Sequence, residues 1–398
     1  MYFEMMFFIK KFQQRLKPGI FVLTIFLGGV LLFQFNFSFL DPISIASEKV
    51  SFRDIYFSKI QGGELKSDQR IVLVDIGDTL KRANIVKLLY KIKKIDYKVL
   101  GIDLRFDVRR PNDPKTDSLL EEFALTTPKV VFGKDELIGG SFFMNDGQEI
   151  KQGLANLGKE DKDFPVRSLL NISKSEPGTH SFAYEIVKTI APNNKSIKHF
   201  ADKKEIDINF ERQNLSVVIK AEELLFDSTN TYLNYLEDKI VIIGSMSDNG
   251  KDIHLVPNAS YNLTTDEDNF YTKVSGPFIH AIAISNLLDE KIIKNSRMFN
   301  WLFSAIIFII TLLVTVKLEY SKSPYVRLIA KSYILGGTLL IFLLYIVLMD
   351  NFLFEFSIGG ALTALVLTME LAGIYHPIEL LSKDFTRFVT KLFSRNSS

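Results

Sequence analysis

The sequence predicts an α/β domain with a mostly parallel sheet flanked by helices, together with four transmembrane α-helices. Three observations predict this architecture. Short apolar runs alternate with segments of helical periodicity in the middle of the chain, which is typical of a parallel sheet covered on both faces. Long uncharged runs lie near both ends of the chain, and Lys and Arg gather beside those runs.

The first uncharged run covers residues 18–40. At a rise of about 1.5 Å per residue, a helix of this length crosses a hydrocarbon core of about 30 Å. A cleaved signal peptide is the alternative, but its apolar region is normally shorter and ends at a small-residue cleavage site. We therefore expect a cytoplasmic N-terminus at 1–17 and one transmembrane helix at 18–40.

Three further membrane helices are expected at 298–316, 332–349 and 352–374. The uncharged part of the last segment is only 356–369, flanked by Glu355 and Glu370, so a re-entrant or buried segment is its alternative. Four crossings place every basic cluster beside these helices on the cytoplasmic side, as the positive-inside rule requires. This topology puts residues 41–297 outside the cytoplasm and both termini inside it, which in a bacterium means a multi-pass inner-membrane protein with a periplasmic domain.

The outer segment contains the elements of the predicted sheet. Buried parallel strands are expected at 70–75, 98–103, 129–133 and 239–244, where β-branched residues dominate. Helices are expected at 80–95, 180–190 and 277–288. The first helix joins two strands, so we expect a right-handed β-α-β unit.

Carboxylates follow the predicted strands. Asp75 and Asp78 come after the first, Asp103 and Asp107 after the second, and Asp252 follows the strand at 239–244. Ligands bind beyond the carboxyl ends of strands in open α/β sheets, so these five residues are the candidate ligand-binding residues. They have two alternatives: Asp commonly caps helices and turns, and paired carboxylates can hold a cation or act as acid and base.

Composition and missing motifs exclude several classes of function. The chain has no Cys, which excludes thiol nucleophiles, Cys-ligated zinc and iron–sulfur clusters. A net charge of +2 gives no electrostatic basis for binding nucleic acid. Five His residues form no H-E-x-x-H motif, and His280 is expected to pack at a helix start. We therefore expect no catalytic residues, no metal, no cofactor and no enzymatic activity.

Several segments together carry a family resemblance. They are Phe52–Phe57, Ile71–Asp75, Val99–Asp103, Asp113–Leu120, Asp238–Gly244, Gly276–Ala281 and Asn286–Leu288. Their order resembles the CHASE2 domain, an extracytoplasmic sensory module of bacterial signalling receptors. The aromatic-proline-arginine segment common in that family is missing between Asp78 and Ile85. Family members usually continue into a cytoplasmic kinase or cyclase domain, whereas only a short tail follows the last predicted helix here.

The tail at 375–398 has helical periodicity. Apolar and basic side chains repeat every three or four residues, which predicts a basic amphipathic helix. Such a helix would lie on an anionic membrane or dock a partner, and a juxtamembrane stop-transfer segment is its alternative. The residues expected at this surface are Lys383, Phe385, Arg387, Phe388, Lys391 and Leu392.

These features favour a non-catalytic sensory or scaffolding protein of the cell envelope. Its outer domain would bind a ligand or an envelope protein, and it would act through partner membrane proteins. The partners expected are membrane lipids, other membrane or envelope proteins, and further copies of the chain as a homo-oligomer. A structural subunit of an envelope complex is the alternative, and a metal-dependent extracytoplasmic enzyme is a less favoured one.

Overall fold

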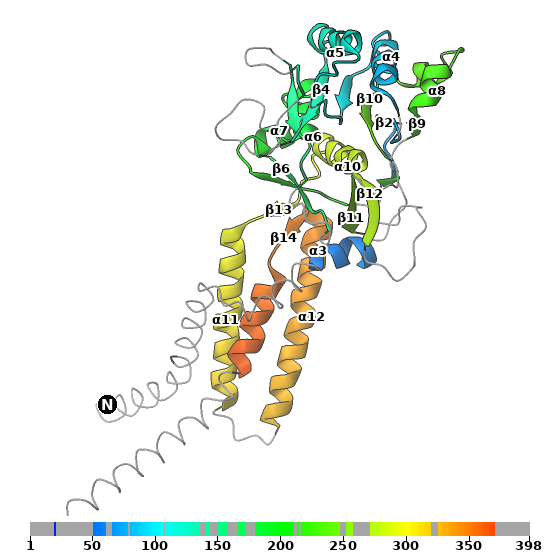
Figure 1. Ribbon diagram of the computed structural model, residues 1–398. Coiled ribbons are helices and arrows are strands. Elements are labelled where there is room, and N and C mark those ends of the chain that lie inside the picture. Colours follow the sequence, from blue (N-terminus) through cyan, green and yellow to red (C-terminus); the bar gives the residue numbers. More distant parts are fainter. Residues whose placement is uncertain are drawn as a thin grey trace, which may run out of the picture. The chain divides into compact units, whose positions relative to one another are not determined.

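Figure 1 shows the chain as a computed structural model. It divides into two compact units, Ala46–Ile293 and Met1–Ile45 together with Lys294–Ser398, and each unit is described by itself. The residues whose structure is described are 20, 51–60, 66–78, 80–106, 108–135, 141–143, 150–157, 165–171, 180–210, 213–214, 217–246, 252–257, 271–319 and 325–370.

A six-stranded sheet forms the centre of the unit Ala46–Ile293, and every neighbouring pair of its strands is parallel. From edge to edge the strands are β5 (Gln152–Leu154), β4 (Val130–Lys134), β3 (Val99–Ile102), β10 (Ile240–Gly244), β2 (Ile71–Asp75) and β9 (Val218–Lys220). The α/β class and the four predicted strands are confirmed. The two edge strands were not predicted, because three residues are too few to show a pattern.

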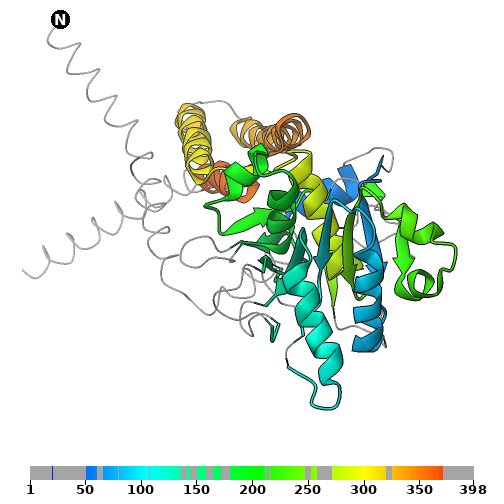
Figure 2. The same cartoon turned by 90° about the horizontal axis from the view of Figure 1, so that it is seen from above.

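Helices cover both faces of this sheet. On one face α4 (Arg82–Ile92), α5 (Pro114–Thr126), α8 (Ala221–Phe226) and α9 (Thr231–Tyr235) bury side chains such as Leu88, Phe123 and Leu224 against the strands. Figure 2 shows α4 and α5 together on that side. On the other face α6 (Phe182–Ile190) packs on β3, β4 and β5, and α10 (Gly276–Leu288) packs on β10 and β2.

A glycine sets how closely α6 approaches the sheet. A Cβ atom built on Gly153 in β5 would lie 2.5 Å from the Cα atom of Phe182. That atom belongs to the backbone of the first turn of α6, so it cannot move aside alone. The contact therefore requires a residue without a side chain at position 153.

The remaining elements of this unit are short. They are α3 (Phe52–Ile55), a π-helix (Tyr56–Ile60), β1 (Lys66–Ser67) paired with β8 (Gln213–Asn214), β6 (Ser168–Leu170) paired with β7 (Glu205–Asp207), α7 (Lys195–Phe200), and β11 (Ile253–Pro257) paired with β12 (Tyr271–Ser275). Ion pairs tie several of them together. Arg167 Nη2 lies 2.6 Å from Asp54 Oδ2, and Arg53 Nη1 lies 2.8 Å from Asp207 Oδ1.

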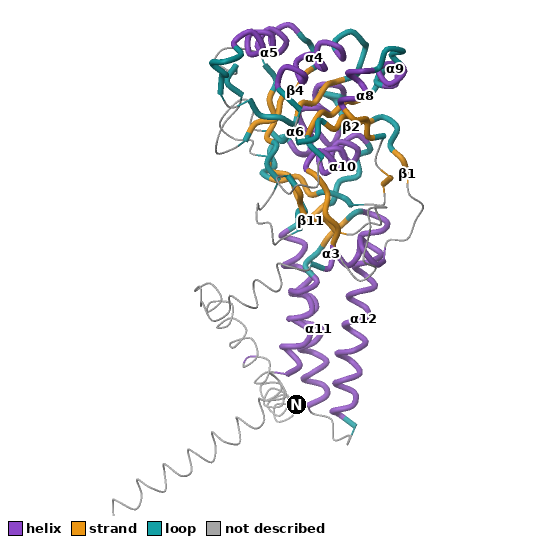
Figure 3. Tube along the Cα trace, turned by 45° about the vertical axis from the view of Figure 1, so that its right-hand side comes forward, coloured by secondary structure: helices purple, strands orange, loops and turns teal. Residues whose placement is uncertain are grey.

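The second unit contains α11 (Arg297–Glu319) and α12 (Val326–Phe352), which run side by side (Figure 3). Within the described residues, two stretches are long and apolar enough to cross a membrane, Arg297–Thr315 and Leu328–Phe352. A short parallel pair, β13 (Lys294–Asn295) and β14 (Phe354–Glu355), connects segments that flank these helices.

The expected membrane segments agree with the structure in part. The segments 298–316 and 332–349 lie within α11 and α12. The helix expected from residue 352 instead begins at Ile358, because Leu353 adopts a left-handed φ of 48° and residues 354–355 pair with β13. That helix is described from Ile358 to Glu370, and the segment 18–40 and the tail 375–398 lie outside the described residues apart from residue 20.

Candidate functional site

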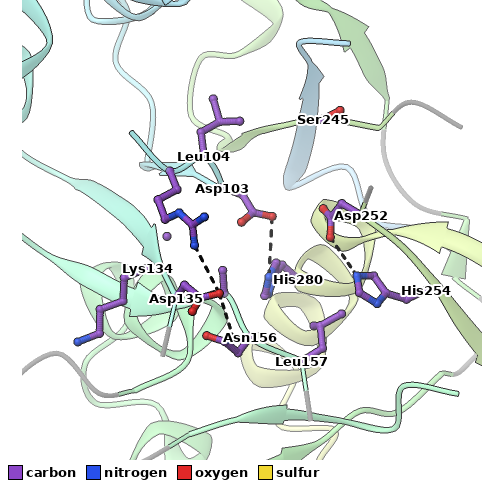
Figure 4. Close-up of a pocket in the computed structure, with 13 residues that line it drawn as sticks. Asp103, Leu104, Lys134, Asp135, Asn156, Leu157, Ser245, Asp252, His254 and His280 are labelled. Carbon is purple, nitrogen blue, oxygen red and sulfur yellow. Dashed lines mark hydrogen bonds and ion pairs between the residues drawn. The ribbon is translucent and has the colours of Figure 1, made fainter. Parts of the chain in front are cut away.

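A cavity of about 510 Å³ opens at the carboxyl ends of β3, β4, β5 and β10 (Figure 4). The chain leaving β3 leads to α5 on one face of the sheet, whereas the chain leaving β10 leads towards α10 on the other face. Diverging connections of this kind leave a crevice between two neighbouring strands, where open α/β sheets bind ligands. The lining residues are Asp103, Leu104, Arg105, Gly133, Lys134, Asp135, Ala155, Asn156, Leu157, Ser245, Asp252, His254 and His280.

Asp103 is the innermost carboxylate of the cavity. Its backbone N–H donates to the carbonyl of Ile243 in the central strand at 2.8 Å, which fixes the residue just beyond β3. Only 11% of its side chain is exposed, and Oδ2 lies 3.9 Å from His280 Nε2. Burial raises the pKa of Asp103 well above its usual value, and the charge on Asp252 raises it further.

His280 projects from the first turns of α10 towards Asp103 (Figure 4). Its ring is 1% exposed and packs edge-on against Phe182, with ring centroids 5.2 Å apart. Burial lowers the pKa of His280 to about 4, although Asp252 and the backbone of Ala155 act in the opposite direction. The imidazole is therefore neutral at neutral pH, and its Nδ1 atom has no hydrogen-bond partner among the described residues.

Asp252 and His254 form the outer side of the cavity. Asp252 Oδ1 lies 2.9 Å from His254 Nε2, and 47% of the Asp252 side chain is exposed. The backbone N–H of Gly276 donates to the Asp252 carbonyl at 3.1 Å, and a Cβ atom on Gly276 would lie 2.5 Å from Asp252 Oδ2. The glycine at the start of α10 therefore makes room for this carboxylate.

The opposite wall carries a second set of charges. Arg105 Nη1 lies 3.6 Å from Asp135 Oδ2, and Asn156 Nδ2 donates to the same oxygen at 3.5 Å. Lys134, the last residue of β4, also lines the cavity. The site thus combines carboxylates, basic groups and two imidazoles with the apolar side chains of Leu104 and Leu157.

The structure places only two of the five predicted ligand-binding residues at the cavity. Asp103 and Asp252 both line the cavity, whereas Asp75 and Asp78 are not among its lining residues. Asp75 Oδ1 accepts a hydrogen bond from the N–H group of Gly77 at 2.8 Å, which is the contact of a turn. It also accepts one from the N–H group of Met246 at 2.9 Å, which ties it to the segment after β10. Asp78 is exposed and accepts from Ser245 Oγ at 3.2 Å, and Asp107 lies outside the described residues.

Several lining residues were not assigned to the site from the sequence. Arg105, Lys134 and Asp135 follow or end predicted strands, so the rule that selected Asp103 also applies to them. Asn156 follows β5, which was not predicted. His280 packs at a helix start as expected, but it also lines the cavity, which depends on the fold and not on local sequence.

The side chains that line the cavity suit the binding of a small polar molecule. In the part of the chain that the structure describes, no group of three or more His, Cys, Asp or Glu side chains is arranged to hold a metal ion. Charged and apolar side chains instead surround a space of the size that small molecules occupy in proteins.

One family model matches the chain, the CHASE2 domain, over residues 19–318. No curated protein and no solved structure gave a significant match to the chain.

Proposed function

The chain belongs to the CHASE2 family of extracytoplasmic sensory domains, and we propose that it is a non-catalytic, membrane-anchored sensor. In this proposal the cavity beside Asp103 binds a small molecule outside the cytoplasm. The conformational change caused by binding is then passed to partner membrane proteins. The alternative form of the same proposal, a scaffold, replaces the small molecule with an envelope protein.

The cavity is the observation that carries the sensory role. Its volume of about 510 Å³ is within the range of small-molecule sites, roughly 300–1,000 Å³. Its polar groups come from segments at the carboxyl ends of four different strands and from α10. A ligand would therefore contact several segments that are far apart in the sequence. A change in the separation of these segments is a physical route from binding to a conformational signal.

Anchoring in the membrane is supported by α11 and α12. Both expose large apolar side chains along their length, as helices do when lipid or other helices surround them. These side chains include Trp301, Leu302, Ile309, Leu313, Leu335, Leu339, Leu340 and Leu343. We propose four crossings in the inner membrane of a bacterium, with both termini in the cytoplasm and the cavity on the periplasmic side, because this topology satisfies the positive-inside rule.

Purification of the tagged full-length protein from its native host, in mild detergent, tests this function. Mass spectrometry of the purified material should detect a membrane or envelope protein in stoichiometric amount. In-cell crosslinking before lysis should capture the same protein and so exclude association after lysis. A monomer that purifies without any stoichiometric partner, and crosslinks to none, would overturn action through partner proteins.

A structural subunit of an envelope complex is the second candidate. Asp75 favours it, because the contacts of its Oδ1 with Gly77 and Met246 are internal to the fold. The variant Asp103→Leu separates the two candidates. A structural subunit should retain both its partner and its cellular function when the cavity is altered, whereas a sensor should retain the partner and lose its response.

A further inference from the structure

We propose that the ligand of the cavity is a small organic molecule with an ammonium group, which binds between Asp103 and Asp252. This inference rests on the proposed ligand-binding function and names the chemical class of the ligand. Three observations support it: Asp103 has no hydrogen-bond donor among the described residues, acidic side chains predominate near it, and apolar side chains line the same cavity.

The carboxyl group of Asp103 receives no hydrogen bond from the described residues. Among the described residues, no side chain or backbone N–H lies within hydrogen-bond distance of its Oδ atoms, and the nearest cationic candidate, His280 Nε2, is 3.9 Å away. That separation exceeds the length of a hydrogen bond. This carboxyl group is 89% buried and lines the cavity, so a ligand bound there could donate the hydrogen bond that the described protein groups do not supply.

His280 does not provide a positive charge beside Asp103. Its imidazole is neutral at neutral pH because of its burial, and its Nδ1 atom is itself without a partner in the described structure. Figure 4 shows the imidazole directly below Asp103, with Asp252 on the adjoining side of the cavity. The two carboxylates are close enough for the charge of one to act on the other. A cation placed between them would be attracted by both.

The charge balance of the described lining residues also favours a cation. Arg105 is paired with Asp135 at 3.6 Å, so these two charges offset one another. Two acidic side chains, Asp103 and Asp252, then remain beside one lysine, Lys134, and one histidine, His254, which lies 2.9 Å from Asp252. A bound cation would favour the ionised form of Asp103, whose pKa is raised by burial. An ammonium group offers three N–H donors and matches the acceptors available here.

An organic cation fits the lining better than a metal ion does. Divalent metals require several converging ligands, and the described residues contain no such group of His, Cys, Asp or Glu. Leu104, Ala155 and Leu157 line the same cavity and would contact the hydrocarbon part of the ligand. Burial of that part contributes to affinity in a way that a metal ion cannot use.

Thermal unfolding of the full-length protein in mild detergent tests this inference. Three probes of matched shape are compared at equal concentration and ionic strength: butylammonium, butyrate and 1-butanol. Butylammonium alone should raise the unfolding temperature. The variant Asp103→Asn should bind it about tenfold more weakly or worse, the loss expected for a hydrogen bond to a charged group.

Asp96→Asn is the matched control, since this carboxylate is exposed and precedes β3 at the other end of the sheet. It should leave the effect of butylammonium unchanged. Asp252→Asn is a second cavity variant, whose half-exposed side chain makes misfolding less of a concern than at Asp103. Asp252→Asn should also weaken the effect.

Other results would overturn the inference. Stabilisation by butyrate that is lost in Lys134→Gln would show an anion site, and it would leave the ligand-binding function intact. Equal stabilisation by all three probes would show binding of the apolar chain alone. Stabilisation by calcium or zinc ions alone, lost in Asp103→Asn, would show a metal site. No effect of butylammonium on the wild-type protein would also contradict the inference, whereas the partner experiment above would test the proposed function separately.

Discussion

Asp54 is a fully buried carboxylate with donors from three separate segments. Its oxygens accept from Ser51 N at 2.9 Å, Arg167 Nη2 at 2.6 Å and Tyr271 OH at 2.9 Å. The interaction joins α3 to β12 and to the segment before β6. Asp54 lies in the opening segment that carried part of the family resemblance, and these contacts give it a structural role.

Arg167→Met should therefore destabilise the domain strongly. Removing one partner of a buried ion pair leaves the other charge unpaired, and the free energy of unfolding should fall by about 3 kcal/mol. Chemical denaturation of the full-length protein in mild detergent measures the change. Arg109→Met is the control, because Arg109 pairs with Glu121 while 55% exposed, and its loss should cost less than about 1 kcal/mol. Equal losses in the two variants would contradict the structural role of Asp54.

His280 should make stability depend on pH. Its pKa is lowered from 6.5 to about 4 in the folded protein, so between these values the unfolded chain binds a proton that the folded chain does not. The free energy of unfolding should therefore fall as pH falls from 6.5 to 4, by up to about 3 kcal/mol from this residue alone.

Denaturation of the wild type and of His280→Gln across this range isolates that contribution. The stability advantage of the wild type over His280→Gln should shrink as pH falls. The contribution of Asp103 to the free energy of unfolding changes with pH in the opposite direction. Its pKa is raised above 3.8, so the folded protein retains a proton that the unfolded chain has lost. The advantage of the wild type over Asp103→Asn should therefore grow as pH falls over the same range. Parallel trends in both variants would show that the two groups are not buried as described.

The sequence led to Asp103 and Asp252 but could not separate them from Asp75 and Asp78. All four follow predicted strands, and the rule about carboxyl ends applies equally to each. The distinction depends on strand order: β10, the last of the six sheet strands in sequence, inserts between β2 and β3. Among the described residues, the cavity is lined from its β3 side and not from its β2 side. Long-range pairing of this kind leaves no local signal in the sequence.

At the scale of elements, the packing of α6 on β5 depends on Gly153. Gly153→Ala would place its Cβ atom 2.5 Å from Phe182 Cα, so the helix or the strand must shift. The free energy of unfolding should fall by about 1–3 kcal/mol, the usual cost of overpacking. Gly359→Ala is the control, because nothing lies within 4 Å of its added Cβ atom. Thermal unfolding of both variants measures the difference, and an unchanged stability for Gly153→Ala would contradict the close approach of α6.

Elements with a strong local pattern were predicted from the sequence, and weak ones were not. The apolar strands β2, β3, β4 and β10 and the helices α4, α6 and α10 lie close to their expected bounds. The edge strands β5 and β9 have only three residues each, and their pairing is decided by their neighbours. The helix at Ile358 starts later than expected, because hydropathy does not show that Leu353 adopts a left-handed conformation.

At the scale of the whole molecule, membrane topology decides what the cavity can encounter. A periplasmic cavity would meet molecules that enter from the environment, whereas a cytoplasmic one would meet metabolites. The chain has no Cys, so a single introduced cysteine can be labelled without background. Ser228, between α8 and α9, is exposed, and Ser321 lies in the sequence between α11 and α12.

Labelling of Ser228→Cys and Ser321→Cys in intact spheroplasts, with a membrane-impermeant maleimide, tests the extracytoplasmic position of the sensory domain most directly. Ser228→Cys should be labelled in intact spheroplasts, and Ser321→Cys only after lysis. The reverse pattern would place the cavity in the cytoplasm and contradict a role in sensing molecules outside it.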